Sequence, residues 1–364
     1  MAAAELRGTV GVWPQAIDHR ELRFELPGLP SELLRLGTVD DLLAVACEVE
    51  DVGRPRAGLA VLHEAAARCD LGGLHALVRT LRPLRDRPSF DVSATFRGKR
   101  NFNRFELEDA AGSGIATALG WRYESRSGGR RPPPTDVSIR VHLSGEHATI
   151  GVRLASAPLH RRDYRRDSRR ASLRPPVARA IALLAGLAPG GRLLDPFCGA
   201  GTIAIEALLA QPGMTSAGYD ADPASVASAR ANSRRARAKA TFEVATASAL
   251  PVADAAVDRI ATNPPWERAV RASGPVADTW RELRRVLSPD GRVALVGPDE
   301  LIDAAAAALA LESVARAPIG LLGQRVSIAV LVPDGRLTAP GQLLGAELDD
   351  AFVRYADAVA TGPP

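Results

Sequence analysis

The residues best suited to chemistry in this chain form a short run, Asn263, Pro264, Pro265 and Trp266, directly after the apolar stretch 256–262. The two prolines fix the backbone in an extended shape. The Asn263 amide oxygen and the Pro264 carbonyl oxygen can then accept both N–H groups of an exocyclic amine. The indole of Trp266 can stack on the ring that carries this amine. The run therefore predicts a catalytic site for a planar aromatic amine, formed by these four residues.

A glycine-rich motif, Asp-Pro-Phe-Cys-Gly-Ala-Gly-Thr at 195–202, ends one apolar run and opens a helical pattern. Its glycines let the backbone pass close to a ligand at the helix N-terminus. Asp220 lies nineteen residues after Gly201, at the tip of the next expected strand, where a carboxylate accepts hydrogen bonds from both hydroxyls of a ribose. Asp222 is better placed to cap the following helix. The motif predicts a nucleotide-like cofactor, but residues 199–204 also fit the dinucleotide fingerprint, which leaves a nicotinamide enzyme open.

The elements that must position these motifs alternate between short apolar runs and helical patterns from residue 176 onward. We expect strands at 192–195, 215–220, 241–245, 256–262, 292–297, 312–318 and 325–332. We expect helices at 176–187, 202–211, 223–238, 276–287 and 299–310. The alternation predicts an α/β fold with a doubly wound, mostly parallel sheet. Residues 334–364 form a tail with a helical pattern over 346–359.

The first half of the chain is less regular and is typical of an α+β region. A strand is expected at 89–96 and a helix at 104–119, followed by a Gly- and Pro-rich surface loop at 125–134. Two alternating strands at 136–143 and 147–154 then predict a hairpin. The remaining residues, 1–88, are mainly compatible with helices and early strands.

Composition bounds the class of protein. The 364 residues are 46% hydrophobic and 24% charged, which is typical of a globular protein and excludes disorder throughout. The sequence has no run of 18 apolar residues and no secretory signal, so we expect a cytoplasmic protein that does not contact membranes. Cys47, Cys69 and Cys198 lack metal-site spacing, which argues against a disulfide framework or structural zinc and fits a reducing compartment. No metal is expected.

Basic charge is concentrated in one segment. The chain carries a net charge of +4, but residues 153–179 hold nine arginines against Asp163 and Asp167, a local charge of +7. Such a concentration is typical of a surface that binds phosphates, although a solvated linker would carry the same charge. Charge alone therefore favours nucleic acid no more than a linker.

The combination of the 195–202 motif, Gly218-Tyr219-Asp220 and Thr262-Asn-Pro-Pro-Trp resembles the class I S-adenosylmethionine-dependent methyltransferases that modify exocyclic amines. Their motif at the second site is (Asn/Asp)-Pro-Pro-(Tyr/Phe/Trp). The stretch from Phe90 through the hairpin to Arg165 is similar to a THUMP domain, an RNA-binding module usually preceded by a ferredoxin-like domain. The resemblance implies a Rossmann-like catalytic domain that acts on RNA. Within the family, the chain is most similar to the tRNA methyltransferases that modify guanine N2 at position 6.

The resemblance implies the domain organisation and the site residues. The expected domains are a ferredoxin-like region at 1–88, a THUMP-like domain at 89–155, an arginine-rich linker at 156–175, the methyltransferase domain at 176–333 and the tail. The cofactor, S-adenosylmethionine, is assigned to Asp195, Phe197, Gly199, Gly201, Thr202, Asp220, Thr246 and Asn263. RNA is assigned to Arg97, Lys99, Arg100, Arg161, Arg162, Arg165 and Arg166. No obligatory protein partner is evident.

Two features depart from the family pattern. Thr246 occupies the position of the acid that is expected to meet the adenine amino group, and its hydroxyl is a weaker, uncharged acceptor. The opening strand of the ferredoxin-like domain is not visible in residues 1–20. The first departure keeps open a non-catalytic RNA-binding protein with a decayed cofactor pocket. The same motifs would also fit a ribosomal RNA guanine-N2 methyltransferase or an adenine-N6 methyltransferase.

Three further residues invite functional roles. We expect Cys198 to be a small loop residue rather than a nucleophile, because a cytosine-C5 enzyme would carry its cysteine where this chain has Pro265. His160 lacks an acidic partner at useful spacing and is expected to contact phosphate or lie on the surface. For Asp258, orientation of the Asn263 loop and a purely structural role remain equally open.

Overall fold

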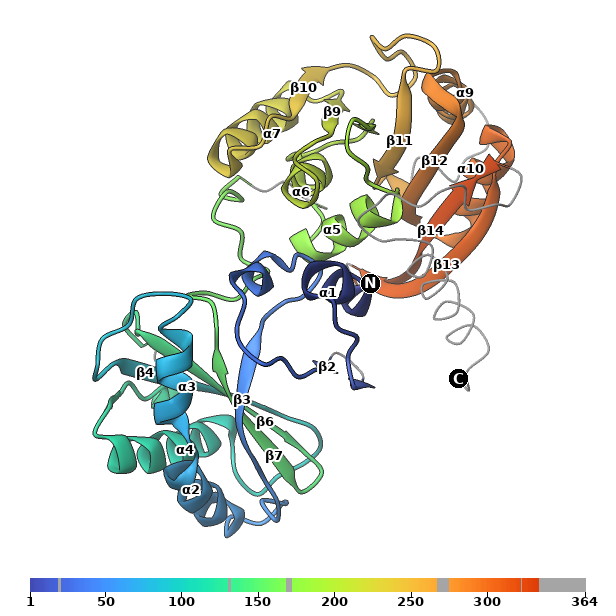
Figure 1. The fold of residues 1–364 in the computed structure, drawn as a ribbon. Coiled ribbons are helices and arrows are strands. Elements are labelled where there is room, and N and C mark those ends of the chain that lie inside the picture. Colours follow the sequence, from blue (N-terminus) through green and yellow to red (C-terminus); the bar gives the residue numbers. More distant parts are fainter. Residues whose placement is uncertain (19–20, 130–131, 168–171, 267–274, 322, 334–364) are drawn as a thin grey trace. The chain divides into compact units, whose positions relative to one another are not determined.

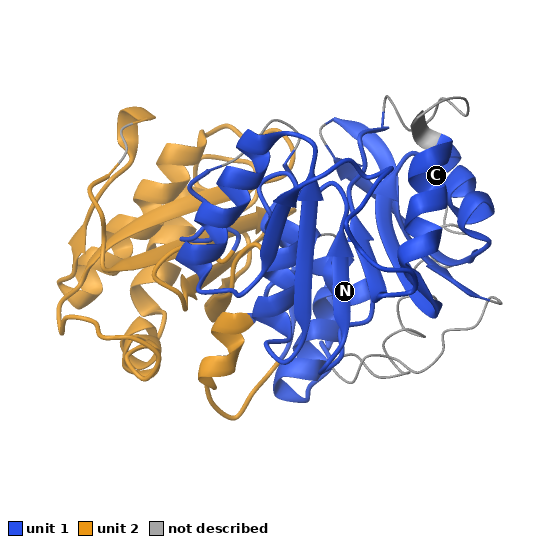
Figure 2. Ribbon diagram, turned by 90° about the horizontal axis from the view of Figure 1, so that it is seen from above, with its two compact units in different colours: residues 1–24, 36–39, 160–364 blue, residues 25–35, 40–159 orange. Residues whose placement is uncertain are grey.

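The computed structural model describes residues 1–18, 21–129, 132–167, 172–266, 275–321 and 323–333. The chain divides into two compact units (Figure 2). Unit 1 contains residues 1–24, 36–39 and 160–364, and unit 2 contains residues 25–35 and 40–159. Each unit is built around its own sheet (Figure 1).

Unit 1 holds a seven-stranded sheet with the order β10-β9-β8-β11-β12-β14-β13. Strand β14 pairs antiparallel with both of its neighbours, β12 and β13, whereas the pairs from β10 to β12 are parallel. The strands are β8 (Arg192–Asp195), β9 (Thr215–Asp220), β10 (Thr241–Val244), β11 (Val257–Thr262), β12 (Leu287–Gly297), β13 (Glu312–Leu321) and β14 (Gln324–Val332). The doubly wound, mostly parallel sheet expected from the sequence is confirmed.

Helices cover both faces of this sheet. They are α5 (Pro175–Leu184), α6 (Thr202–Ala210), α7 (Pro223–Ala236), α9 (Pro275–Val286) and α10 (Asp299–Leu309). Ile181 of α5 and Ile203 of α6 pack with Leu193 in one core, whereas Trp280 of α9 packs with Leu194 in a second core. Neighbouring strand residues thus face opposite layers, as the twofold alternation of a strand requires. The helices and strands expected between residues 176 and 332 are present, with bounds that differ by a few residues.

The strand order reverses between β8 and β11, and we call the space expected at the carboxyl ends of these two strands the crevice. From β8 the chain moves outward through α6 and β9, whereas from β11 it moves the other way through α9 and β12. Loops that leave the carboxyl ends of such neighbouring strands diverge and leave space for a ligand. The 195–202 motif follows β8 and Asn263 follows β11, so both motifs lie at this switch point.

Unit 2 holds a five-stranded sheet with the order β3-β7-β6-β4-β5. Its strands are β3 (Leu43–Val49), β4 (Ser89–Phe96), β5 (Arg122–Tyr123), β6 (Val137–Ser144) and β7 (His147–Arg153). Its helices are α2 (Gly58–Arg68), α3 (Leu71–Val78) and α4 (Arg104–Leu119), with short 3-10 turns at Ser31–Arg35 and Ser127–Gly129. The expected strand at 89–96, helix at 104–119 and hairpin are confirmed.

Helix starts follow capping chemistry. Asn103 and Glu106 form a reciprocal capping box at the start of α4. Asp222 accepts a hydrogen bond from the Ala224 N–H at the start of α7, as expected.

The start of the chain belongs to unit 1. Residues 2–10 form helix α1 (Ala2–Val10), followed by the short hairpin of β1 (Ala16–Asp18) and β2 (Glu21–Arg23). All of these residues group with unit 1 rather than with the sheet of unit 2. The buried Glu5 carboxylate explains this placement, since it lies 3.3 Å from Arg179 Nε of α5 and accepts the Thr38 N–H at 2.7 Å. The compact units therefore divide the chain elsewhere than the expected boundary at residue 88.

The expectation against a disulfide is wrong. Cys47 of β3 and Cys69 at the end of α2 are paired, with their Cα atoms 5.7 Å apart. Their separation of 22 residues gave no framework pattern, and only the packing of α2 beside β3 brings them together. Cys198 is the remaining cysteine and is buried.

The described residues offer neither a membrane span nor a metal centre. Among them, no helix is long and apolar enough to cross a membrane. In the same part of the chain, no group of three His, Cys, Asp or Glu side chains could hold a metal ion.

Candidate active site

The glycine loop after β8 depends on two left-handed residues. Gly201 has a φ of 79°, and a Cβ there would lie 2.8 Å from the Phe242 ring, so this position requires glycine for both conformation and packing. Gly199 has a φ of 52°, but a Cβ there would meet no atom within 4 Å. The backbone at Gly199 therefore borders open space, which suits a ligand that approaches the N-terminus of α6.

Asp220 holds this loop from the tip of β9. Its Oδ2 accepts the Gly199 N–H at 2.9 Å, and its Oδ1 accepts the Asp222 N–H at 2.9 Å. A carboxylate oxygen can accept two hydrogen bonds, so each oxygen of this half-buried side chain can still accept one from a ligand hydroxyl. Asp220 thus holds the glycine loop in its conformation and can bind the ribose hydroxyls at the same time.

A buried hydrogen bond joins the two motifs. The Thr262 hydroxyl donates to Asp195 Oδ1 at 3.1 Å, and both residues are at most 1% exposed. The Phe197 N–H donates to the same oxygen at 3.3 Å. Burial raises the pKa of Asp195 to about 7, and the nearby Asp220 carboxylate adds to this effect. Asp195 is therefore a proton-sensitive group between the glycine loop and the residue that precedes Asn263.

Asn263 presents a buried acceptor without a partner. Its Oδ1 has no hydrogen bond to any part of the chain that the structure describes. A buried acceptor left unpaired costs about 1–3 kcal/mol, so folded proteins rarely keep one without a reason. The rigid Pro264, which is buried, follows it directly. The arrangement supports a ligand N–H as the missing donor.

Trp266 is anchored by its indole. Its Nε1–H donates to the Val296 carbonyl oxygen at 3.1 Å, and the ring packs against both cores of unit 1. The side chain is nevertheless only half-buried, which leaves part of it open to a ligand. Pro265 beside it is exposed.

The other predicted cofactor residues border the same crevice. Thr202 is buried at the first turn of α6, and Phe197 is half-buried in the loop. Thr246 is exposed, two residues after β10, and its Oγ1 lies 3.4 Å from the Ser248 hydroxyl. The preceding residue, Ala245, donates its N–H to the Asp220 carbonyl oxygen, which places Thr246 next to Asp220.

The surroundings of Cys198 and Asp258 indicate their roles. Burial, together with the negative charges of Asp195 and Asp220, raises the pKa of the Cys198 thiol, which opposes a nucleophilic role. Asp258 pairs with Arg192 at 3.1 Å, at the opposite end of β11 from Asn263. This geometry supports the purely structural role of Asp258 and opposes a role in orienting the Asn263 loop.

The predicted RNA-binding residues fall in two groups. Arg97 and Lys99 are exposed on the loop between β4 and α4 of unit 2, where Arg100 donates to the Arg97 carbonyl oxygen. In unit 1, Arg161 and Arg166 are exposed, and Arg165 is half-buried.

Arg162 differs from its neighbours. Its Nε donates to Glu206 Oε1 at 2.8 Å, and its Nη2 donates to the Gly37 carbonyl oxygen at 2.8 Å. The guanidinium is therefore engaged inside unit 1.

Sequence reasoning named Thr262 without giving it a role, and it missed two polar residues behind the glycine loop, Glu206 and Asn232. Glu206 and Asn232 are fully buried on α6 and α7. Asn232 follows the buried Val226 and Ala229 at helical spacing, so a polar residue on an apolar face was the available signal.

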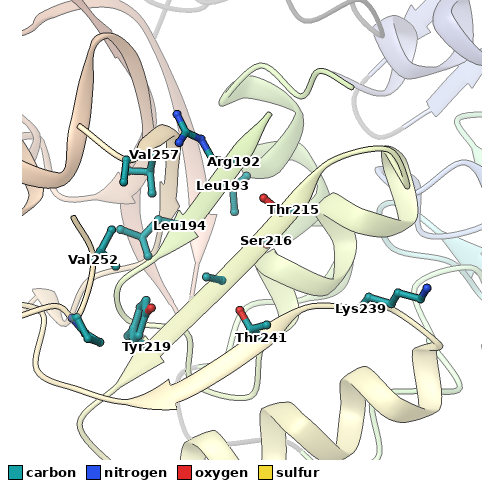
Figure 3. A pocket seen from close by; sticks show the side chains of 13 residues that line it. Arg192, Leu193, Leu194, Thr215, Ser216, Tyr219, Lys239, Thr241, Val252 and Val257 are labelled. Atoms are coloured by element: carbon teal, nitrogen blue, oxygen red, sulfur yellow. The ribbon is translucent and has the colours of Figure 1, made fainter. Parts of the chain in front are cut away.

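A cavity of about 310 Å³ lies elsewhere in unit 1 (Figure 3). Arg192, Thr215, Thr241 and Val257 line it, and these residues begin their strands, at the edge of the sheet opposite to the motifs. The chain passes from β10 to β11 without a helix, which leaves this part of the sheet face uncovered. The cavity runs along this face as far as Leu194 and Tyr219, and Asn263 is not among its lining residues.

The chain resembles known methyltransferases. Residues 162–313 match the model of an RMKL-like methyltransferase domain. The chain is 38% identical over 218 residues to the tRNA (guanine(6)-N2)-methyltransferase of Thermus thermophilus, covering 57% of this chain and 62% of the relative. It is 28% identical over 193 residues to the U6 snRNA (guanine-N(2))-methyltransferase THUMPD2 of Bos taurus, covering 52% and 36%. This chain thus spans less than two thirds of these relatives.

A solved structure shares the architecture over most of the chain. The crystal structure of TrmN from Thermus thermophilus matches with a TM-score of 0.72 and 27% identity, covering 91% of this chain and 95% of that one. A predicted N6-adenine-specific DNA methylase from Listeria monocytogenes matches with a TM-score of 0.60 and 18% identity, covering 83% and 86%, which shows a common fold. These matches confirm the Rossmann-like fold class and the resemblance to guanine-N2 methyltransferases.

Proposed function

We propose that this chain, which carries an RMKL-like methyltransferase domain over residues 162–313, methylates the exocyclic N2 amine of a guanosine in tRNA. The observation that carries the proposal is the buried Asn263 Oδ1, which lacks a hydrogen-bond donor among the described residues. An aromatic amine supplies that donor. The names of the similar proteins, which include tRNA and U6 snRNA guanine-N2 methyltransferases, support guanine as the base.

The residues of the crevice fit S-adenosylmethionine, which supplies an electrophilic methyl group on a sulfonium. Asp220 would accept hydrogen bonds from the ribose hydroxyls. The backbone at Gly199 leaves room for close approach, and the N-terminus of α6 favours the cofactor carboxylate. Thr246 would meet the adenine amine with a neutral acceptor, which costs affinity but does not remove the contact.

The amine would be held by two acceptors. Asn263 Oδ1 and the Pro264 carbonyl oxygen would each accept one N–H of the guanine amine, which directs the nitrogen lone pair away from the ring. The bound cofactor would supply its methyl group to this nitrogen and leave as the neutral thioether, and the methylated amine would lose a proton to water. Positioning of this kind contributes about 7–11 kcal/mol to lowering a barrier. The rigid prolines keep both acceptors in place without reorganisation.

RNA would be held by cations of both units. We assign phosphate contacts to Arg97, Lys99 and Arg100 of unit 2 and to Arg161, Arg165 and Arg166 of unit 1. Arg162 is left out because Glu206 and Gly37 engage its guanidinium. A guanine in a paired stem must be flipped to reach Asn263, at a cost of a few kcal/mol that these contacts offset.

The domain assignments belong to the same proposal. The THUMP-like domain at 89–155 would recognise the RNA, preceded by the ferredoxin-like region at 1–88 and joined through 156–175 to the catalytic domain at 176–333. A cytoplasmic location accompanies a tRNA substrate. The tail at 334–364 lies outside the described residues.

The deciding experiment identifies the modified nucleoside. The full chain is incubated with labelled S-adenosylmethionine and with separated tRNA and ribosomal RNA, and the digested RNA is analysed by mass spectrometry. We expect N2-methylguanosine in tRNA. Label in ribosomal RNA or in N6-methyladenosine would replace the substrate, and a folded protein that binds NAD(P) or labels no RNA would overturn the proposal.

A further inference from the structure

The basic segment, which we define as residues 160–167, is fastened to the catalytic domain rather than hanging from it. Arg162 Nε donates to Glu206 Oε1 of α6 at 2.8 Å, and the Tyr164 hydroxyl donates to the same oxygen at 2.9 Å. Tyr164 is 5% exposed and Glu206 is fully buried. The two side chains therefore fix the first part of the segment on α6, one turn beyond the glycine loop.

A second attachment runs through Asn232 of α7. The Asn232 Nδ2 group donates to the Asp167 carbonyl oxygen at 2.9 Å and to the Ala200 carbonyl oxygen at 3.0 Å. Its Oδ1 accepts the Asp167 N–H at 3.4 Å and Arg235 Nη1 at 3.1 Å. One fully buried amide thus bridges the end of the basic segment and the middle of the glycine loop.

The Ala200 carbonyl, which Asn232 holds, lies in the middle of the glycine loop. Ala200 lies between Gly199 and Gly201, both of which adopt positive φ, so the orientation of its peptide decides how the loop amides face the cofactor. Apolar packing makes the same connection, because Tyr164 shares a core with Cys198 of the loop and with Phe242, which packs against Gly201. The basic segment and the loop are therefore two sides of one packed layer.

We propose that Asn232 is a positioning residue that couples RNA binding on the basic segment to cofactor binding at the glycine loop. The inference rests on the proposed function. Phosphates that engage Arg161 and Arg166 stabilise the fastened conformation of the segment, and the Asn232 amide that holds Asp167 also holds the Ala200 carbonyl in that conformation. The cofactor then orders a loop whose entropy cost has been reduced, so each ligand tightens the binding of the other.

Thermodynamic linkage makes the coupling measurable from either side. If RNA tightens cofactor binding by a certain factor, the cofactor must tighten RNA binding by the same factor. Coupling between sites is typically about 5–150-fold. A purely structural role of Asn232 would instead weaken cofactor binding equally with and without RNA.

The test measures the affinity of the full chain for S-adenosylhomocysteine by calorimetry, with and without a saturating tRNA transcript. We expect the parent to bind at least about fivefold tighter with RNA. Asn232→Ala should reduce this ratio to below about twofold, and Asn232→Asp, which cannot donate to either carbonyl, should do the same. Arg234→Ala is the matched control, since it removes an exposed arginine of the same helix and leaves Asn232 with its bonds to Asp167 and Ala200, and it should keep the ratio.

Hydrogen exchange of the parent provides an arm that needs no variant. RNA should raise the protection of amides in residues 196–204 before any cofactor is added. A parent ratio near one, an Asn232→Ala ratio equal to that of the parent, or unchanged exchange in 196–204 would overturn the inference. Methylation by the parent is measured in parallel. If the parent methylates RNA but shows no coupling, only the inference is rejected. If the parent does not methylate RNA, the proposed function is rejected.

Discussion

The five-stranded sheet of unit 2 and the seven-stranded sheet of unit 1 differ in the charges that lie near their buried polar side chains. In unit 2, Asp91 accepts hydrogen bonds from Thr135 and Ser138 at 2.9 and 2.8 Å and from Arg126 at 3.3 Å. Even Glu108, whose Oε2 accepts no hydrogen bond among the described residues, has Arg126 Nε 3.7 Å away. In unit 1, the Asn263 amide oxygen meets no hydrogen-bond donor within the described part of the chain.

The contrast separates a surface from a site. Unit 2 keeps Arg126 near the buried carboxylates of Asp91 and Glu108 and turns Arg97 and Lys99 outward, which suits recognition of a polyanion. Unit 1 leaves a fixed acceptor unsatisfied at the switch point of its sheet, which suits capture of one donor group. Variants of Asn263 in unit 1 should therefore change turnover, and variants of the exposed cations in unit 2 should change RNA affinity.

The largest effect should follow removal of the unsatisfied acceptor. We expect Asn263→Ala to reduce single-turnover methylation about 10²–10³-fold, because one preorganised hydrogen bond to the reacting amine is lost. Cofactor and RNA affinities should stay close to those of the parent. Asn263→Asp, which retains an acceptor oxygen, should lose less activity. A folded Asn263→Ala protein with parental turnover would show that the acceptor does not hold the amine.

The next effect concerns stability against pH. The pKa of Asp195 is about 7 in the folded chain and about 3.9 in an unfolded one, so between these values the folded chain retains a proton that the unfolded chain has lost. Rising pH therefore removes stability, by about 3–4 kcal/mol between pH 4 and pH 8.

Asp195→Asn should flatten this dependence in denaturant titrations of the cofactor-free protein. Asp258→Asn is the control with the opposite sign, because the bonds from Arg192 lower the pKa of Asp258, and the stability they add is lost as the pH falls. Identical pH dependence in Asp195→Asn and the parent would show that Asp195 titrates normally.

A smaller effect is expected at the ribose contact. Asp220→Ala should weaken S-adenosylmethionine binding by about 1.5–3 kcal/mol, the worth of hydrogen bonds to a charged group. Asp220→Asn should weaken it less, since one oxygen still accepts the Gly199 N–H. Calorimetric titration provides the comparison, and unchanged affinity in folded Asp220→Ala would remove this residue from the cofactor site.

The smallest effect per residue is expected on unit 2. Replacing Arg97, Lys99 and Arg100 together by alanine should lower the slope of log affinity against log salt by about 2–3, since each phosphate contact contributes about 0.7–0.9. Turnover at saturating RNA should stay unchanged. Arg68→Ala, which removes an exposed arginine of α2, should leave the slope as it is. An unaltered slope in the triple variant would place the RNA elsewhere.

These surface variants are cleaner than deletion of the first half of the chain. Helix α1 belongs to unit 1, and its Glu5 forms a buried pair with Arg179. Removing Glu5 would leave a buried charge without this partner, which is typically costly. Loss of methylation after such a deletion would therefore report on folding as well as on RNA binding.

The sequence by itself determined the seven-stranded sheet and the motifs at the carboxyl ends of its strands. Twofold and helical periodicities from residue 176 onward predicted every strand and helix that the structure describes in unit 1 after this point, because burial on both faces leaves a strong pattern. The Asn263 run and the glycine loop were equally readable, since prolines and glycines specify their backbone locally. Neither pattern needed distant contacts to be recognised.

Only the tertiary structure decided which polar residues serve the fold and which remain for ligands. Arg162 looks like its neighbours in sequence, yet Glu206, 44 residues away, engages it. Asn232 meets Ala200 and Asp167 only after α7 packs on the loop, and Cys47 meets Cys69 only after α2 packs beside β3. Such partners are set by the packing of whole elements, and local spacing carries no record of them.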